Sequence, residues 1–206
     1  LLLLVAVVIA GLGLARGLRG LVVQGVADDL PLGLVQRPDR LDDLSLGFTQ
    51  VSASHAGHSE PLVWEGIIVS TWAGDKGGLG ALGLVKDAKK LYEKAIEINP
   101  QALDGSAYNS LGVLYYKVPG WPVGFGDKDK AKALLEKALQ INPQGIDPNF
   151  FYAEYLIETK QPRMAVVYLE KALNAPARPT RQLADAGRRE EVLTLLKKAR
   201  QTLANP

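Results

Sequence analysis

The two histidines of the chain, His55 and His58, lie three residues apart and are followed by Glu60. At this spacing on a helix, two imidazoles lie on one face and can bind a single metal ion. A catalytic zinc site needs a third ligand placed by the fold, and the H-E-x-x-H pattern is absent. We therefore interpret these residues as a polar helix end before Pro61, and predict neither a metal site nor another cofactor.

Three glycines, Gly78, Gly80 and Gly83, form a G-x-G-x-x-G pattern. A dinucleotide site needs a strand before this pattern and a parallel strand after the following helix. The preceding segment 62–74 could pass for a strand in isolation. The segment after the glycines is typical of a helix that runs to Asn99-Pro100 and is followed by another helix. The pattern therefore does not predict nucleotide binding.

Nucleophilic and acid–base catalysis find little support in the sequence. There is no cysteine, and the G-x-S-x-G pattern that presents a catalytic serine is absent. Acidic pairs such as Asp42 with Asp43 and Glu190 with Glu191 are typical of solvated helix faces. We therefore predict that the protein is not an enzyme.

The composition is that of an ordinary globular chain, so the elements must be found from patterns within it. The 206 residues carry a formal net charge of +2, with 47% hydrophobic and 22% charged residues. This length suits one domain with a sizeable core. The charge gives no indication of nucleic acid or an anionic membrane as a partner.

The first fifteen residues contain no charge or strong polar group. As a helix they would span about 22 Å, short of a hydrocarbon core of about 30 Å. This length favours a signal peptide over residues 1–20. A retained N-terminal anchor that continues to Val23, interrupted by Arg16 and Arg19, is the main alternative, and a buried core helix is the third. The first two predict a periplasmic location or the outer face of the cytoplasmic membrane.

An internal repeat organises the middle of the chain. A Glu-Lys-Ala core recurs at Glu93, Glu136 and Glu170, at intervals of 43 and 34 residues. In each copy a helical stripe of small and large apolar residues is followed by proline, which ends the helix. The stripes consist of Ala88, Tyr92 and Ala95, then Ala131, Leu135 and Ala138, then Ala165, Leu169 and Ala172.

This pattern resembles the tetratricopeptide repeat. The resemblance rests on the three stripes with Pro100, Pro143 and Pro176, and on Tyr108, Leu111, Gly112 and Tyr115 in one preceding helix. It implies an all-α solenoid with three helical hairpins over residues 61–176, the first of them marked by Leu62, Gly66 and Val69. It also implies protein binding, because this family consists mostly of scaffolds.

Two of the three repeats contain extra residues. In the second repeat most of them fall between Tyr115 and Ala131, and in the first they fall in residues 73–85. We expect enlarged loops between the two helices of each hairpin, on one edge of the solenoid. Such loops often bind partners. Alternatively, Trp121, Phe125 and Leu79 cover the ends of the protein's own helices.

The first helices of the hairpins line the concave surface in the repeat family, which implies a set of partner-binding residues. A mixed aromatic and polar surface suits an extended peptide or a helix. Together with the loop aromatics, the predicted partner-binding residues are Asn109, Tyr116, Lys117, Trp121, Phe125, Phe150, Glu154 and Glu158.

The segments outside the repeats complete the expected architecture. Residues 21–60 are interpreted as a linker followed by a helix over 39–58, which precedes a helix at 61–72. Residues 177–206 form a C-terminal cap with a helix from about Arg181 to Leu203. Its apolar stripe consists of Val192, Leu193, Leu195, Leu196 and Ala199.

The whole pattern also resembles the T component associated with periplasmic tripartite solute transporters. The shared points are the export segment, the second helix that begins near Asp127, and the C-terminal cap. Lipoprotein relatives carry a cysteine after the export segment, and this sequence has none. The resemblance implies an exported, non-catalytic scaffold that binds a protein partner, with membrane contact only through residues 1–23 if they are retained.

Two other functions stay open from the sequence. One is a carrier of a small hydrophobic ligand in a pocket beneath the glycine-rich loops, and the other is a membrane-anchored assembly subunit.

Overall fold

The computed structural model describes residues 49–55, 57–78 and 80–204, and within these residues the protein is all-α, with no strand. The predicted signal peptide or anchor and the linker lie outside the described residues. The helices are α4 (Glu60–Lys76), α5 (Ala81–Ile98), α6 (Ala102–Lys117), α7 (Lys128–Ile141), α8 (Ile146–Glu158), α9 (Pro162–Leu173) and α10 (Gln182–Ala204).

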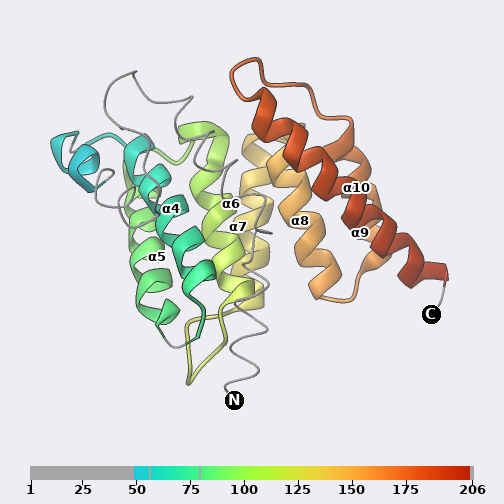
Figure 1. Ribbon diagram of the computed structural model, residues 1–206, viewed down its shortest axis with the longest axis horizontal. Helices are drawn as coiled ribbons and strands as arrows, with labels where there is room; N and C mark the ends of the chain where they lie inside the picture. The colour runs from blue at the N-terminus through green and yellow to red at the C-terminus, as the bar shows by residue number, and fades with distance from the viewer. Residues whose placement is uncertain (1–48, 56, 79, 205–206) are drawn as a thin grey trace.

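Consecutive helices pair into three hairpins, α4–α5, α6–α7 and α8–α9, which stand side by side in one row (Figure 1). The last helix, α10, packs on α9 and also contacts α8. The predicted solenoid of helical hairpins with a C-terminal capping helix is confirmed.

The second helix of every hairpin buries the same three positions. These are the residues of the predicted stripes, and each of them is at most 1% exposed. Because alanine stands at the first and third position, the backbones of neighbouring helices can approach closely, and the large central residue fills the groove.

Two glycines set how closely the hairpin helices approach. A Cβ atom on Gly66 of α4 would lie 2.5 Å from the Tyr92 ring, and one on Gly112 of α6 would lie 2.8 Å from Leu135 Cγ. Real Cβ contacts are longer than this, so a side chain at either position would force the helices apart. The third hairpin has the buried Ala153 in the place of these glycines.

The helix ends follow local sequence signals. Asp127 precedes α7, and its side chain accepts hydrogen bonds from the backbone N–H groups of Asp129 and Lys130, both at 3.0 Å. These bonds satisfy donors that have no partner inside the helix. Helix α5 ends before Asn99-Pro100 and α7 before Asn142-Pro143, as the prolines predict.

The enlarged loop that we expected over residues 73–85 is not present. Helix α4 continues to Lys76 and α5 begins at Ala81, so most of the extra residues lengthen the two helices. The two helices contain 17 and 18 residues, whereas α8 and α9 contain 13 and 12. The reason is that Ala73 and Ala81 continue the buried apolar stripes and are both fully buried.

The N-terminal helix is shorter in the described residues than the predicted 39–58, because only residues 49–54 are helical there and residues 39–48 are not described. The predicted helix at 61–72 is the longer α4. Its first turn contains Pro61, which is tolerated there because the first N–H groups of a helix have no partner within it.

The capping helix α10 buries Val192, Leu196 and Ala199 as predicted. Leu193 was expected in the same stripe, but it is 53% exposed because it is turned about 100° around the helix from Val192. Arg189 donates hydrogen bonds to the carbonyl oxygens of Leu173 and Ala175, and so supplies partners to groups at the end of α9. None of the described helices is long and apolar enough to cross a membrane.

Candidate functional site

The loop that separates α6 from α7, residues 118–127, is anchored at its base and free at its tip. Phe125 packs edge-to-face on Tyr115 with ring centroids 5.4 Å apart, and the Lys89 ammonium lies 5.9 Å from the Phe125 centroid. Gly126 N donates to Pro119 O at 2.9 Å and Asp127 N to Tyr115 O at 2.8 Å. Trp121, in contrast, is 90% exposed. Phe125 therefore packs on the protein, and Trp121 does not.

Four predicted residues form one polar network between α6 and α8. Tyr116 Oη donates to Glu154 Oε2 at 2.5 Å. Lys117 Nζ donates to Glu154 Oε1 at 3.0 Å and to Glu158 Oε1 at 3.4 Å. Burial raises the pKa of Tyr116 well above its usual value, and the negative charge of Glu154 raises it further. These side chains are thus brought together, but they bind one another.

The structure corrects the expected placement of Phe150. We expected this ring on the open concave surface, but it is 7% exposed and the Arg188 guanidinium lies 4.6 Å from its centroid. Arg188 is equally close to the neighbouring Phe151. The C-terminal helix thus covers Phe150 with a cation, an arrangement favoured by the negative face of the aromatic ring.

Asp147, near the start of α8, joins this helix to the C-terminal cap. Its two carboxylate oxygens accept hydrogen bonds at 2.8 Å from Arg178 Nη1 and Arg188 Nε. Arg178 also donates its backbone N–H and its Nε to Asp185, and Arg188 donates to Glu191. Charge-assisted pairs of this kind are stronger than neutral hydrogen bonds.

The pKa shifts in this cluster follow from burial and from the paired charges. Burial by itself would raise the pKa of Asp147, but the Arg188 and Arg178 guanidiniums outweigh it and hold the pKa below its usual value. Glu191 shows the opposite balance, because burial raises its pKa more than Arg188 lowers it.

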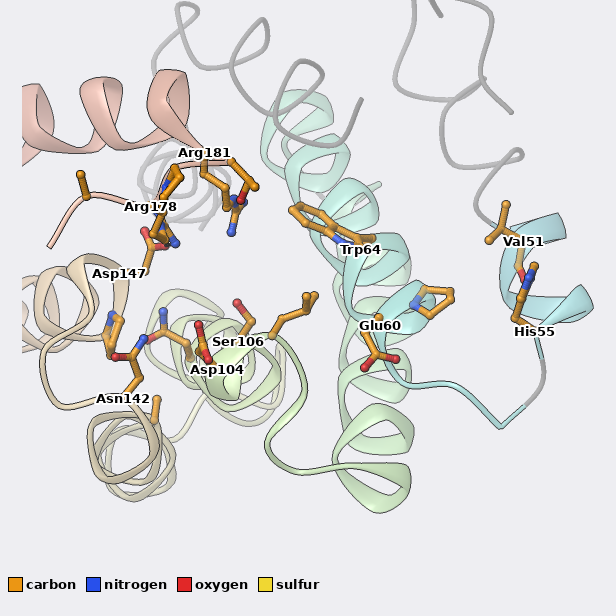
Figure 2. Close-up of a pocket in the computed structure, with 18 residues that line it drawn as sticks. Val51, His55, Glu60, Trp64, Asp104, Ser106, Asn142, Asp147, Arg178 and Arg181 are labelled. Atoms are coloured by element: carbon orange, nitrogen blue, oxygen red, sulfur yellow. Dashed lines mark hydrogen bonds and ion pairs between the residues drawn. The ribbon is translucent and has the colours of Figure 1, made fainter. Parts of the chain in front are cut away.

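A cavity of about 710 Å³ opens beside this cluster, at the end of the row where α6 and α8 begin. Its walls come from α4, α6, α8 and the segment that links α9 to α10, with Val51, His55 and the end of α7 completing the lining. Figure 2 shows Arg178 and Arg181 on one side of it and Asp104 with Ser106 on the other. The Arg181 guanidinium lies 5.1 Å from the Trp64 ring centroid. The cavity lining therefore contains charges of both signs and an aromatic wall.

The first turn of α6, which forms part of this lining, has an unusual backbone. Leu103, Asp104 and Gly105 have φ values of 47°, 55° and 79°, in the left-handed region. Glycine enters this region freely and aspartate is several-fold enriched there, whereas leucine rarely adopts it. The backbone preferences of these three residue types therefore do not predict a left-handed turn here.

Among the predicted partner-binding residues, Asn109 lies in the cavity wall and has a hydrogen-bond acceptor without a partner. It is 4% exposed, and its Oδ1 has no hydrogen-bond partner. Since most buried polar groups are paired, an unpaired amide in a cavity wall indicates a place where a ligand atom could bind.

Of the residues that line this cavity, the sequence analysis predicts Asn109 alone as partner-binding, and the residues that it misses include Trp64, Asp104, Arg178 and Arg181. Trp64 lies on the first hairpin, for which no partner-binding residues were predicted. The two arginines lie in the proline-rich segment after α9, and this segment was interpreted as part of the cap.

Two residues of the candidate metal motif, His55 and Glu60, line the cavity, but the motif gains no further ligand there. The His55 and His58 rings stand edge-to-face at 6.3 Å. In the described part of the chain, no three His, Asp or Glu side chains are grouped so that they could hold a metal ion. The segment before the glycine pattern is helical, and Gly83 lies within α5, so the strand considered for nucleotide binding is replaced by α4.

Comparison with protein families gives one match. Residues 79–102 and 124–144 match the family model described as tetratricopeptide repeat. These segments contain α5 and α7, the second helices of the first two hairpins. The search of curated proteins found no match. Two segments of the chain therefore match the tetratricopeptide repeat, as the spacing of the alanine stripes predicts.

Proposed function

We propose that this protein is a non-catalytic scaffold that binds a segment of a partner protein along its concave surface and at the tip of the 118–127 loop. Tetratricopeptide repeats generally mediate protein–protein interactions, which supports a protein partner. The observation that carries the proposal is the cavity walled by three successive first helices, α4, α6 and α8.

The two surfaces contribute differently. The cavity offers the unpaired amide of Asn109 and a lining with charges of both signs. The loop offers Trp121, an aromatic side chain of the type that is enriched at the centres of protein interfaces. Because Phe125 and the backbone bonds at the base hold the loop, Trp121 is presented at little cost in conformational entropy.

The cavity gives no support to a carrier of a hydrophobic ligand. Its lining includes Glu60 and Asp104, and a purely apolar ligand would desolvate both carboxylates without giving either of them a partner. Trp121 is too exposed to roof a pocket beneath its loop.

The proposed cellular context is the periplasm or the outer face of the cytoplasmic membrane, with a solute-transport or other envelope complex as the setting. This part rests on the apolar segment at residues 1–23 and on the resemblance to the transporter-associated T component. N-terminal sequencing of the protein isolated from the envelope tests it. A mature start near Arg16 is expected, and recovery from the cytoplasm would contradict export.

Site-specific photocrosslinking in the native envelope tests the binding surfaces. A photoreactive phenylalanine replaces Ser106 in the cavity wall or Trp121 at the loop tip, and Val167 on the outer face of α9 serves as the control. We expect the same protein partner to be captured from positions 106 and 121 but not from 167. Equal capture from all three positions, or none from 106, would contradict binding along the concave surface.

A further inference from the structure

We infer that the cavity accepts the cationic side chain of a lysine or arginine from the bound segment. This inference rests on the proposed function, and it adds the chemistry that the cavity selects.

Carboxylates outnumber cations in the lining of the cavity. The acids are Glu60, Asp104 and Asp147, and the cations are Arg178 and Arg181, with His55 counted as neutral as in the formal net charge. The whole chain, in contrast, carries a formal net charge of +2. A negative surface on a slightly basic protein attracts a positively charged segment and disfavours an acidic one.

The cations beside the cavity already have partners within the protein. Arg178 binds Asp147 and Asp185, and Arg188 binds Asp147 and Glu191. Arg181 lies against the Trp64 ring.

Two carboxylates of the lining have no such match. Glu60 and Asp104 make neither a side-chain hydrogen bond nor an ion pair with any residue in the described part of the chain. They belong to different walls of the cavity, since Glu60 is the first residue of α4 and Asp104 lies in the first turn of α6. A cation between these walls would supply the positive charge that they lack.

Asn109 gives independent evidence for a ligand with N–H donors. Its amide is nearly completely buried in the cavity wall, and its Oδ1 makes no hydrogen bond. Leaving a buried acceptor unpaired costs about 1 to 3 kcal/mol. An ammonium or guanidinium group carries several N–H donors, so it can satisfy this oxygen and a carboxylate together.

The remaining walls suit the aliphatic stem of such a side chain. Pro61, Trp64, Leu103 and Pro148 contribute apolar surface to the lining. Lysine and arginine bury their methylene groups along apolar surface while the charged end meets polar groups. The volume of about 710 Å³ lies within the range of pockets that hold small ligands.

The direct test uses three capped peptides that differ at their central residue, Ac-Gly-Ser-Arg-Ser-Gly-NH2 and its Gln and Glu counterparts. The full chain, labelled with ¹⁵N, is titrated with each peptide, and shifts of the Asn109 side-chain amide and the Trp64 indole are followed by NMR. We expect the arginine peptide to shift both signals and to bind at least about fivefold more tightly than the glutamine peptide, the size of an ion-pair contribution. Tighter binding of the glutamate peptide, or no shift at Asn109, would overturn the inference.

Two variants assign the interaction to its residues. Asp104→Asn keeps a residue that tolerates the left-handed backbone, and it should reduce arginine-peptide affinity about fivefold and weaken the salt dependence. Asn109→Leu removes an unpaired buried amide, so it should leave stability unchanged or higher while it abolishes the shift at the Trp64 indole. Asp87→Asn, in an exposed pair on α5, is the control and should change neither.

The inference and the proposed function fail in different ways. If photocrosslinking captures a partner and Asp104→Asn leaves that capture unchanged at low and high salt, the inference is wrong and the scaffold function stands. If no partner is captured but the arginine peptide binds as described, the chemistry of the cavity stands and the scaffold function is wrong.

Discussion

The Tyr116 hydroxyl donates to the Glu154 carboxylate at 2.5 Å, and this bond joins the first helix of the second hairpin to the first helix of the third. The residues are 38 positions apart in sequence, and their contact exists only because the hairpins stack. The concave surface is thus partly a set of bonds between repeats, and these bonds compete with any partner for the same side chains.

Replacing Tyr116 by phenylalanine should destabilise the protein by about 1.5 kcal/mol, because the partly buried Glu154 carboxylate loses a short hydrogen bond. Urea unfolding followed by circular dichroism measures the change. Tyr108→Phe is the control, since the Tyr108 hydroxyl makes no hydrogen bond within the described residues. Equal losses for the two variants would show that the bond to Glu154 contributes nothing.

Replacing Asp147 by asparagine should cost about 3 kcal/mol at neutral pH, because Arg178 and Arg188 lose their shared anion. The folded pKa of Asp147 is lowered, so its stabilisation is complete above the unfolded value of about 3.9 and is lost as the pH falls through the folded value. The difference between wild type and variant should therefore shrink in acid.

Unfolding curves between pH 7 and pH 3 test this dependence. Asp87→Asn, whose carboxylate is exposed, should change stability by less than about 1 kcal/mol at every pH. A difference between wild type and Asp147→Asn that stays constant down to pH 3 would contradict the assigned role of the carboxylate.

Replacing Gly112 by alanine should destabilise the protein by about 1 to 3 kcal/mol, because the new methyl group would lie 2.8 Å from Leu135 Cγ. Gly83→Ala is the matched control. This glycine lies in α5 with open space around it, so alanine should stabilise the helix by about 0.5 kcal/mol. Thermal unfolding should move in opposite directions for the two variants, and a shared direction would refute the close-approach argument.

Alanine at the two loop aromatics should separate packing from binding. Phe125→Ala should cost about 1 to 2 kcal/mol, because the half-buried ring packs on Tyr115. Trp121→Ala should leave stability within about 0.5 kcal/mol and weaken partner capture at the concave surface. A destabilised Trp121→Ala variant with normal capture would reverse these roles.

The hairpins could be predicted from the sequence because their signals are local. The alanine positions around Tyr92, Leu135 and Leu169 recur at helical spacing, and prolines mark where the second helices end. Helix length has no such local signal. The segment at 73–85 contains glycines that suggest a loop, yet Ala73 and Ala81 are buried, and the segment is mostly helical.

The candidate site was only partly predictable. The expected positions on the concave side of the first helices identified Asn109, Tyr116 and Glu154. They did not predict that Tyr116 and Glu154 bind each other. The Arg178–Asp147 pair joins residues 31 positions apart, and its formation depends on where the cap crosses α8. No local pattern encodes such a distance.

Two connecting segments of similar length should respond oppositely to inserted residues. The 118–127 loop is bonded at its base, but its tip around Trp121 is solvent-exposed, so extra residues there would displace nothing. The segment between α9 and α10 is held by Arg178 to both Asp147 and Asp185. Lengthening it would shift the register of these bonds and move the cap. The fold therefore tolerates inserted residues at the loop tip, whereas the segment before α10 has to keep its length.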